Sequence, residues 1–277
     1  SRGLGDVYKR QFLNSVSLIS DAGHNLSDVV SLVLALLAFK LARVKPNSKY
    51  TYGYKKSTVL VSLLNACILL VAVGVIVWES IGKLREPHPV EGGAIAWVAG
   101  VGIVINAFTA WLFMKDRKRD LNVKGAFLHM AADALVSLGV VVSGIVISAT
   151  GWYVIDPIIG LVIAAVILVS TTHLLFDSLR LSLDGVPSGV VAPEELRRRI
   201  METEPAVHDI HHIHIWALST TENALTAHVV IGSAEEEGRV KAAVKHDLAE
   251  MGITHSTLEF EYPGGNACSA GECHSCR

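Results

Sequence analysis

Five long apolar stretches constrain this chain more than any other feature. They lie near residues 15–42, 57–82, 92–114, 125–150 and 155–180. Crossing the hydrocarbon core of a bilayer takes roughly 20 residues of α-helix at about 1.5 Å rise per residue. One such stretch could be the buried core helix of a soluble protein. Five in series with short connectors predict an α-helical multi-pass membrane domain, and the low charged fraction of 18% agrees with this.

Basic residues gather in two of the connectors. They are Arg43, Lys45, Lys49, Lys55 and Lys56 after the first stretch, and Lys115, Arg117, Lys118, Arg119 and Lys124 after the third. Connectors rich in Lys and Arg stay in the cytoplasm. Counting spans from them predicts an integral membrane protein whose C-terminal part also lies in the cytoplasm.

The same topology places residue 15 outside the cell, although Arg2, Lys9 and Arg10 precede it and the chain has no initiator Met. A basic segment outside conflicts with the charge rule. We therefore expect one further span upstream in the natural protein and a non-native or linker-like start at residues 1–14. The alternative is a five-span protein with its N-terminus outside.

The C-terminal third has a different pattern, which begins after residue 187. Amphipathic periodicity predicts helices at 193–204 and 235–251, and alternation predicts strands at 208–218, 224–232 and 255–262. The order α-β-β-α-β is typical of a ferredoxin-like α+β domain. We therefore expect a membrane domain at 15–187, a cytoplasmic domain at 188–262 and a Cys-rich tail at 263–277.

Two apolar stretches carry the ionisable residues that matter most here, because such residues are costly in a bilayer and therefore indicate function. His24 and Asp28 lie in the first stretch, and His129 and Asp133 lie in the fourth. Both pairs follow the spacing His-x-x-x-Asp, which places the side chains on one helix face with Cβ atoms about 5–6 Å apart. One such pair in a soluble helix is usually a surface pair. The pattern is present in both of these apolar stretches, with no nearby Lys or Arg.

Two such helices facing each other supply two nitrogens and two oxygens. This tetrahedral ligand set suits zinc, and it also accommodates cobalt or cadmium. Zinc ligands must be deprotonated, so binding releases protons and loading from one side can be coupled to protonation from the other. These four residues are the predicted transport site.

Several separated motifs resemble one known family. The segments "SLISDAGHNLSD", "LNVKGAFLHMAADALVSLG", "WESIGKLREPHPVEGG" and "VHDIHHIHIWALS" are similar to the cation diffusion facilitator family, and within it to bacterial zinc exporters. The resemblance runs from about residue 12 to 262. It implies six membrane helices, a homodimer, exchange of cytoplasmic zinc for protons, and a bacterial inner or plasma membrane location. The match begins at what would be the second helix.

The resemblance also assigns residues in the cytoplasmic domain. It implies a zinc site formed by His211, His228, His255 and Glu261, whereas His208, His212 and His214 are expected to be structural or surface histidines. The tail residues Cys268, Cys273 and Cys276 resemble the metal-binding cysteine tails of some relatives. A flexible tail without metal is the alternative for them.

Two alternatives to a zinc/proton antiporter are compatible with the membrane part of the sequence. One is a transporter of the same fold for another divalent ion, such as cadmium or cobalt, and another is a non-transporting membrane metal sensor. The sequence contains no nucleophile motif, and four protein ligands would leave zinc no open position, so no enzyme activity is expected. The expected partners are zinc ions, protons, the lipid bilayer and a second copy of the chain, with no nucleic acid.

Overall fold

The computed structural model describes residues 33–85, 92–118 and 120–262. They divide into two compact units. The first contains residues 33–41 and 61–175, and the second contains residues 42–60 and 176–262.

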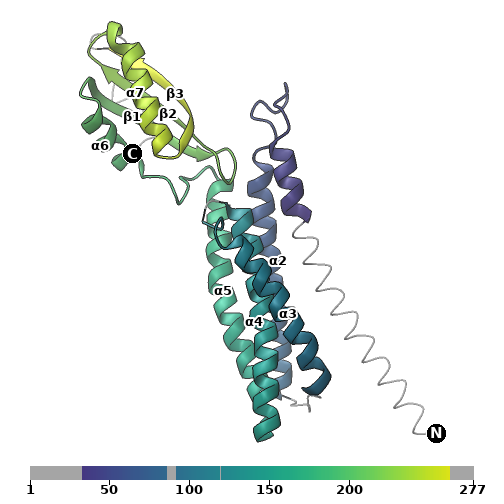
Figure 1. The fold of residues 1–277 in the computed structure, drawn as a ribbon. Coiled ribbons are helices and arrows are strands. Elements are labelled where there is room, and N and C mark those ends of the chain that lie inside the picture. The colour runs from purple at the N-terminus through teal and green to yellow at the C-terminus, as the bar shows by residue number, and fades with distance from the viewer. Residues whose placement is uncertain (1–32, 86–91, 119, 263–277) are drawn as a thin grey trace, which may run out of the picture. The chain divides into compact units, whose positions relative to one another are not determined.

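Long helices make up the first unit (Figure 1). They are α2 (Ser57–Arg85), α3 (Gly92–Phe113), α4 (Leu121–Thr150) and α5 (Ile155–Ser182), preceded by a shorter apolar helix at Val33–Ala42. Each of the last four predicted stretches therefore contains one helix. Among the described residues, α2 and α5 are long and apolar enough to cross a membrane.

Helix α4 begins at Leu121, four residues before the predicted start of its apolar stretch. The cause is Asp120, whose carboxylate accepts hydrogen bonds from the backbone N–H groups of Asn122 and Val123, at 2.6 and 3.4 Å. This carboxylate satisfies N–H groups that the first helical turn leaves without partners. At the other end, Gly151 takes a left-handed conformation with φ of 69°, which glycine adopts without strain.

The outer surfaces of α2 and α5 are apolar. Their exposed large side chains include Leu60, Leu64, Val71, Val75 and Trp78 on α2, and Val162, Val166, Val169 and Phe176 on α5. Soluble monomers rarely expose contiguous apolar surface on this scale. Lipid chains are a suitable environment for such side chains, so this surface agrees with a membrane domain.

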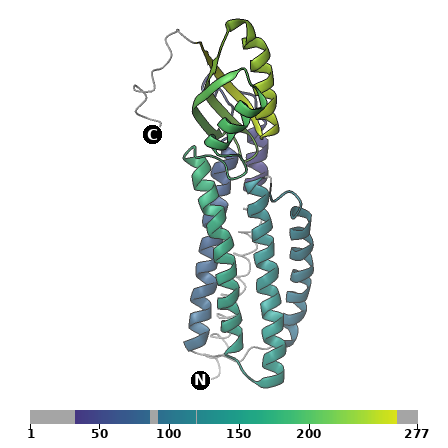
Figure 2. The same cartoon turned by 90° about the vertical axis from the view of Figure 1, so that its left-hand side faces the viewer.

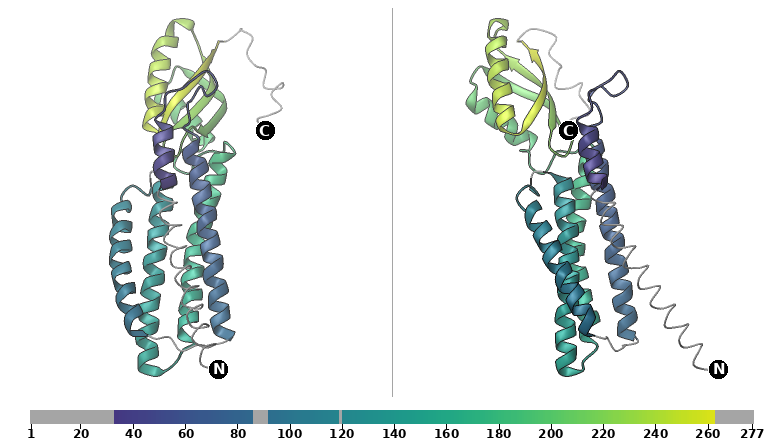
Figure 3. Two further views of the ribbon diagram at one scale, coloured as in Figure 1. Left: turned by 90° about the vertical axis from the view of Figure 1, so that its right-hand side faces the viewer. Right: turned by 45° about the vertical axis from the view of Figure 1, so that its right-hand side comes forward.

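Helices α2, α4 and α5 lie side by side (Figure 2; Figure 3). Val73, Ala132, Ala164 and Ile167 form a buried cluster from all three helices. Gly139 of α4 lies so close to α5 that a Cβ atom placed on it would be 2.5 Å from Ile163 Cδ1. Small residues of this kind allow membrane helices to pack closely.

The second unit contains the α+β elements that the sequence predicts after residue 187. Its elements follow the predicted order: α6 (Pro193–Thr203), β1 (Val207–Ala217), β2 (Asn223–Ile231), α7 (Glu237–Glu250) and β3 (Ile253–Glu261), with a 3-10 turn η1 (Ala234–Glu236) before α7. The sheet has the order β1-β2-β3, with β1 antiparallel and β3 parallel to β2.

One face of this sheet forms the core of the domain. Leu196 and Ile200 of α6 and Val240, Val244 and Leu248 of α7 are buried together with Leu225, Val229 and Ile231 of β2. Because side chains alternate between the faces of a strand, the residues between these core positions lie on the opposite face. His228 is one of them, so the second face carries the histidines.

Candidate metal sites

The first candidate site lies on α4, within the membrane bundle. His129 and Asp133 are both buried, and His129 Nε2 lies 3.8 Å from Asp133 Oδ2. The helix is continuous through both residues, so the i, i+4 spacing puts them on one face, as the sequence predicts. A nitrogen and a carboxylate oxygen are therefore held next to each other in the buried part of the helix bundle.

This arrangement can supply two of the four ligands of a tetrahedrally coordinated ion. Zinc takes nitrogen and oxygen ligands at about 2.0–2.2 Å, which places two ligands of one ion roughly 3.4 Å apart. The observed separation is close to that value, so a small side-chain rotation would bring both atoms onto one cation. The other predicted half, His24 and Asp28, lies outside the described residues, and the four-ligand site stays a prediction.

The second candidate site lies on the histidine-bearing face of the cytoplasmic sheet. His211 of β1 and His228 of β2 are direct cross-strand partners, with ring centroids 5.5 Å apart. Glu261, at the end of β3, places its Oε1 atom 2.6 Å from His228 Nδ1 and 3.6 Å from His211 Nε2. Three of the four residues that the resemblance implies are therefore together.

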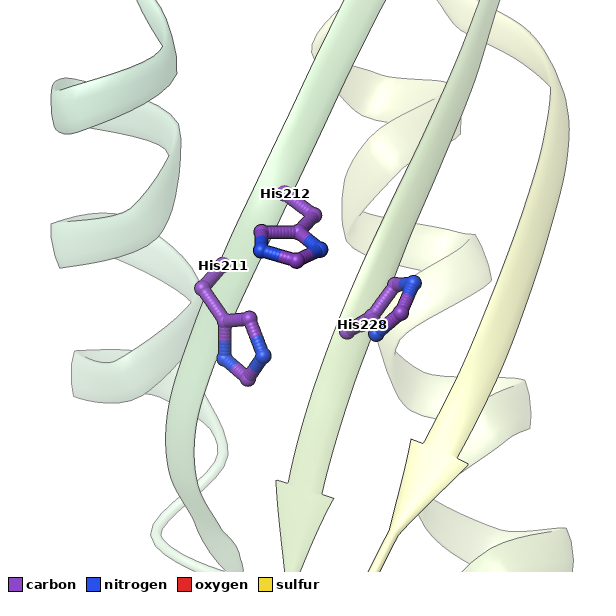
Figure 4. A group of neighbouring side chains, drawn as sticks. All are labelled: His211, His212 and His228. Carbon is purple, nitrogen blue, oxygen red and sulfur yellow. The ribbon is translucent and has the colours of Figure 1, made fainter. Parts of the chain in front are cut away.

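His212 also belongs to this cluster, although alternation predicts that it points elsewhere. The pairing of β1 with β2 shifts between His211 and His214, and His212 has a positive φ of 49°. Such a bulge re-aims one side chain. As a result the His212 ring lies 4.9 Å from that of His211 and 4.7 Å from that of His228 (Figure 4).

The sequence carried a signal for this residue that simple alternation missed. Histidine is one of the few residue types enriched at positive φ, together with Asn and Asp. Adjacent histidines on a strand can lie on one face only if a bulge separates them. The pair His211-His212 is therefore a pattern compatible with a bulged metal site.

His255 is not part of this cluster. It lies opposite Ala224 on β2, four residues from His228, which corresponds to about 13 Å along a strand. Its ring instead contacts the ring of Tyr52, edge to face, at 5.5 Å between centroids. Within the described chain, His212 rather than His255 thus lies beside the other three predicted ligands.

The chemistry of this cluster fits a metal ion. Among the described residues, His211, His212 and His228 form a group whose donor atoms all lie within 4.8 Å of one another. His211 Nε2 is buried without a hydrogen-bond partner in this part of the chain. Burial and then the neighbouring charges of His228 and His211 lower the pKa of His212, which favours the neutral form that binds metals. Side-chain rotations that move the three nitrogens by about an ångström would bring them to the spacing of zinc ligands.

The predicted tail ligands Cys268, Cys273 and Cys276 lie outside the described residues.

Comparison with known proteins decides the family. The model of the cation efflux transmembrane domain matches residues 11–181, and that of the cytoplasmic domain of cation efflux proteins matches residues 191–261. The chain belongs to the cation efflux family. It is therefore an integral membrane protein with a cytoplasmic C-terminal domain, as the basic connectors predict.

Relatives in this family are transporters rather than enzymes. The "Cadmium, cobalt and zinc/H(+)-K(+) antiporter" of Bacillus subtilis is 33% identical over 94% of this chain and 85% of its own length. The zinc transporter ZitB of Escherichia coli is 34% identical over 94% of this chain and 82% of its own. The cation efflux system protein CzcD of Alcaligenes sp. is 37% identical over 93% of this chain and 82% of its own length.

A solved structure also matches. It is the metal-bound C-terminal domain of the CzcD transporter from Cuprividus metallidurans, 38% identical, covering 26% of this chain and 99% of that one, with a TM-score of 0.24.

Proposed function

We propose that this cation efflux protein exports zinc from the cytoplasm by zinc/proton antiport, through a site formed by His24, Asp28, His129 and Asp133. The observation that carries the proposal is the buried pair on α4, with His129 Nε2 and Asp133 Oδ2 3.8 Å apart. An ionisable pair at this depth is costly unless it serves a transported ion or proton. A divalent cation shared with His24 and Asp28 would offset that cost for both helices.

Proton coupling follows from the chemistry of these ligands. Zinc binds the neutral imidazole and the ionised carboxylate, so protons and zinc compete for the same atoms. Loading zinc from the cytoplasm releases protons, and protonation from outside releases zinc. Rocking of the helices about a fixed site then gives alternating access.

Zinc is the best-supported substrate among the divalent ions. ZitB is named as a zinc transporter, and the Bacillus relative is named for cadmium, cobalt and zinc. Two imidazoles with two carboxylates suit zinc, but cobalt and cadmium accept the same set. Transport of cadmium or cobalt is therefore the second candidate. A non-transporting sensor is less well supported, because the named relatives are transporters.

We further assign the cytoplasmic cluster of His211, His212, His228 and Glu261 to a resident zinc ion. Supporting it are the three imidazole donors within 4.8 Å and the buried Nε2 of His211. We also propose that the chain forms a homodimer, that residues 15–187 contain five spans and 188–262 a ferredoxin-like domain, and that the cysteines of 263–277 bind metal.

The transport proposal is tested in proteoliposomes with internal metal and pH indicators. Asp133→Ala should reduce zinc flux and zinc-dependent proton flux to the level of empty vesicles, because the cation loses a charged ligand. Asp116→Ala, which removes an exposed aspartate from the connector after α3, is the matched control and should retain both fluxes. Unchanged zinc flux in Asp133→Ala would overturn the site, and a series with cadmium, cobalt and manganese would rank the ions.

A further inference from the structure

An ion pair between α6 and β1 adjoins the cytoplasmic histidine cluster. Arg197 of α6 donates to Asp209 Oδ1 from both Nε and Nη2, at 3.0 and 2.7 Å. The other oxygen, Oδ2, lies 3.4 Å from His211 Nδ1. Asp209 therefore lies between an arginine, which cannot bind a cation, and a histidine of the candidate metal site.

The two nitrogens of His211 have different surroundings. Nδ1 faces Asp209, whereas Nε2 lies 3.6 Å from Glu261 Oε1. Figure 4 shows one nitrogen of this ring turned toward His228 and the other turned away from it. The nitrogen that faces the cluster is buried and has no hydrogen-bond partner in the described chain.

This ion-pair contact resembles the arrangement by which proteins prepare a metal-binding histidine. A ligating imidazole almost always presents its other N–H to a carboxylate or a carbonyl, which sets the tautomer and the ring orientation. An ionised carboxylate near Nδ1 favours the proton there and leaves the Nε2 lone pair for the metal. Arg197 contributes by holding Oδ1, so that Oδ2 remains directed at the ring.

We propose that Arg197 and Asp209 are positioning residues for the cytoplasmic metal site, fixing His211 with its proton on Nδ1 and its Nε2 lone pair toward a divalent cation. The inference rests on the proposed metal site at His211, His212 and His228. It adds that α6, which contributes no ligand, helps to set the affinity of that site. It also predicts that His211 binds through Nε2.

The structure provides a matched control on the same helix. Arg198 is the next residue, and its guanidinium pairs with Glu195 and Glu202 within α6 itself. Both arginines are about half exposed or more, and exposed ion pairs contribute little to stability. Arg197→Gln and Arg198→Gln should therefore fold alike and differ only in their effect on His211.

Cobalt(II) is the probe, since its visible absorption reports the number and type of ligands in the same donor set that suits zinc. The full chain in detergent is titrated with cobalt, and the cytoplasmic signal is defined as the part that His211→Ala removes. Asp209→Asn should weaken the apparent affinity of this signal by about 10- to 100-fold, and Arg197→Gln, which acts through Asp209, should weaken it by a smaller factor and alter its band shape. Arg197→Lys should restore part of the affinity, and Arg198→Gln should leave it unchanged.

The outcomes separate this inference from the proposed function. If His211→Ala removes no cobalt signal, the metal site itself is wrong. If it removes one but Arg197→Gln binds cobalt with unchanged affinity and spectrum, the metal site stands and the positioning role is overturned. The cobalt spectrum of Asp209→Asn could instead show one ligand fewer while Arg197→Gln has no effect. In that case Asp209 is a ligand, and the positioning role is again overturned.

Discussion

The His129–Asp133 pair on α4 and the histidine cluster on the sheet bring candidate metal ligands together on different kinds of backbone. On α4, regular helix periodicity alone brings His129 Nε2 and Asp133 Oδ2 to 3.8 Å. On the sheet, His211 and His228 meet across two strands, and His212 joins them because β1 is irregular between His211 and His214. The helical site depends on spacing within one element, whereas the sheet site depends on a local departure from regular structure.

The largest effect is expected from a comparison of substitutions at two histidines of the sheet. His228→Ala should weaken cobalt binding at the cytoplasmic site by about 100-fold, because structural metal sites lose several kcal/mol with each ligand. His255→Ala should leave binding unchanged, since its ring contacts Tyr52 instead. Cobalt titration of the full chain in detergent measures both. Equal losses from the two substitutions would show that the cluster is not the binding unit.

A smaller effect is expected from packing in the bundle. Gly139→Leu places side-chain atoms where a Cβ alone would be 2.5 Å from Ile163 Cδ1 and 3.0 Å from Ile159 Cγ2. Overpacking of this kind costs about 1–3 kcal/mol. Gly74→Leu is the control, because nothing lies within 4 Å of a Cβ at that position on α2. Thermal unfolding in detergent should separate the two variants, and equal midpoints would contradict the close contact.

Gly139→Leu also tests whether the membrane bundle and the cytoplasmic cluster act independently. The substitution acts on the membrane bundle, so cobalt binding at the cytoplasmic cluster should stay at its original affinity. A loss of cytoplasmic binding with the fold retained would mean that the two sites are coupled.

The smallest effect concerns the bulge. His212 has a φ of 49°, which a β-branched residue adopts only with strain, whereas Asn tolerates it. His212→Val should therefore be less stable than His212→Asn by about 1–2 kcal/mol. Thermal unfolding of the full chain measures the difference, and both variants should lose the His212 contribution to cobalt affinity. Equal stability would indicate that the positive φ carries no strain.

The sequence predicted the helices well because their signal is mostly length and hydrophobicity. Each of the last four stretches corresponds to a helix, and the early start of α4 arose because the polar residues around Asp120 concealed its first turn. The prediction that His129 and Asp133 share one helix face needed only their spacing. Both predictions rest on one regular element, which is why local sequence was sufficient.

The cytoplasmic site was harder to predict for a physical reason. Alternation assumes that every residue of a strand continues the pairing, and a single bulge reverses the expected face of the next side chain. His212 was therefore expected to be a structural or surface histidine. His255 was grouped with His211 and His228 by resemblance, although pairing with Ala224 places it elsewhere along β2. Register depends on contacts between strands, which one strand's sequence does not contain.

The mixed sheet also implies an order of assembly. β1 and β2 form an antiparallel hairpin with a short connection, so His211 and His228 can meet through local folding. Glu261 joins only after α7 has crossed over and β3 has paired in parallel with β2. Hairpins form faster than such non-local pairings. During synthesis, which proceeds from the N-terminus, the nascent domain would therefore have its imidazoles before its carboxylate, and its affinity for metal would rise in steps as the chain is completed.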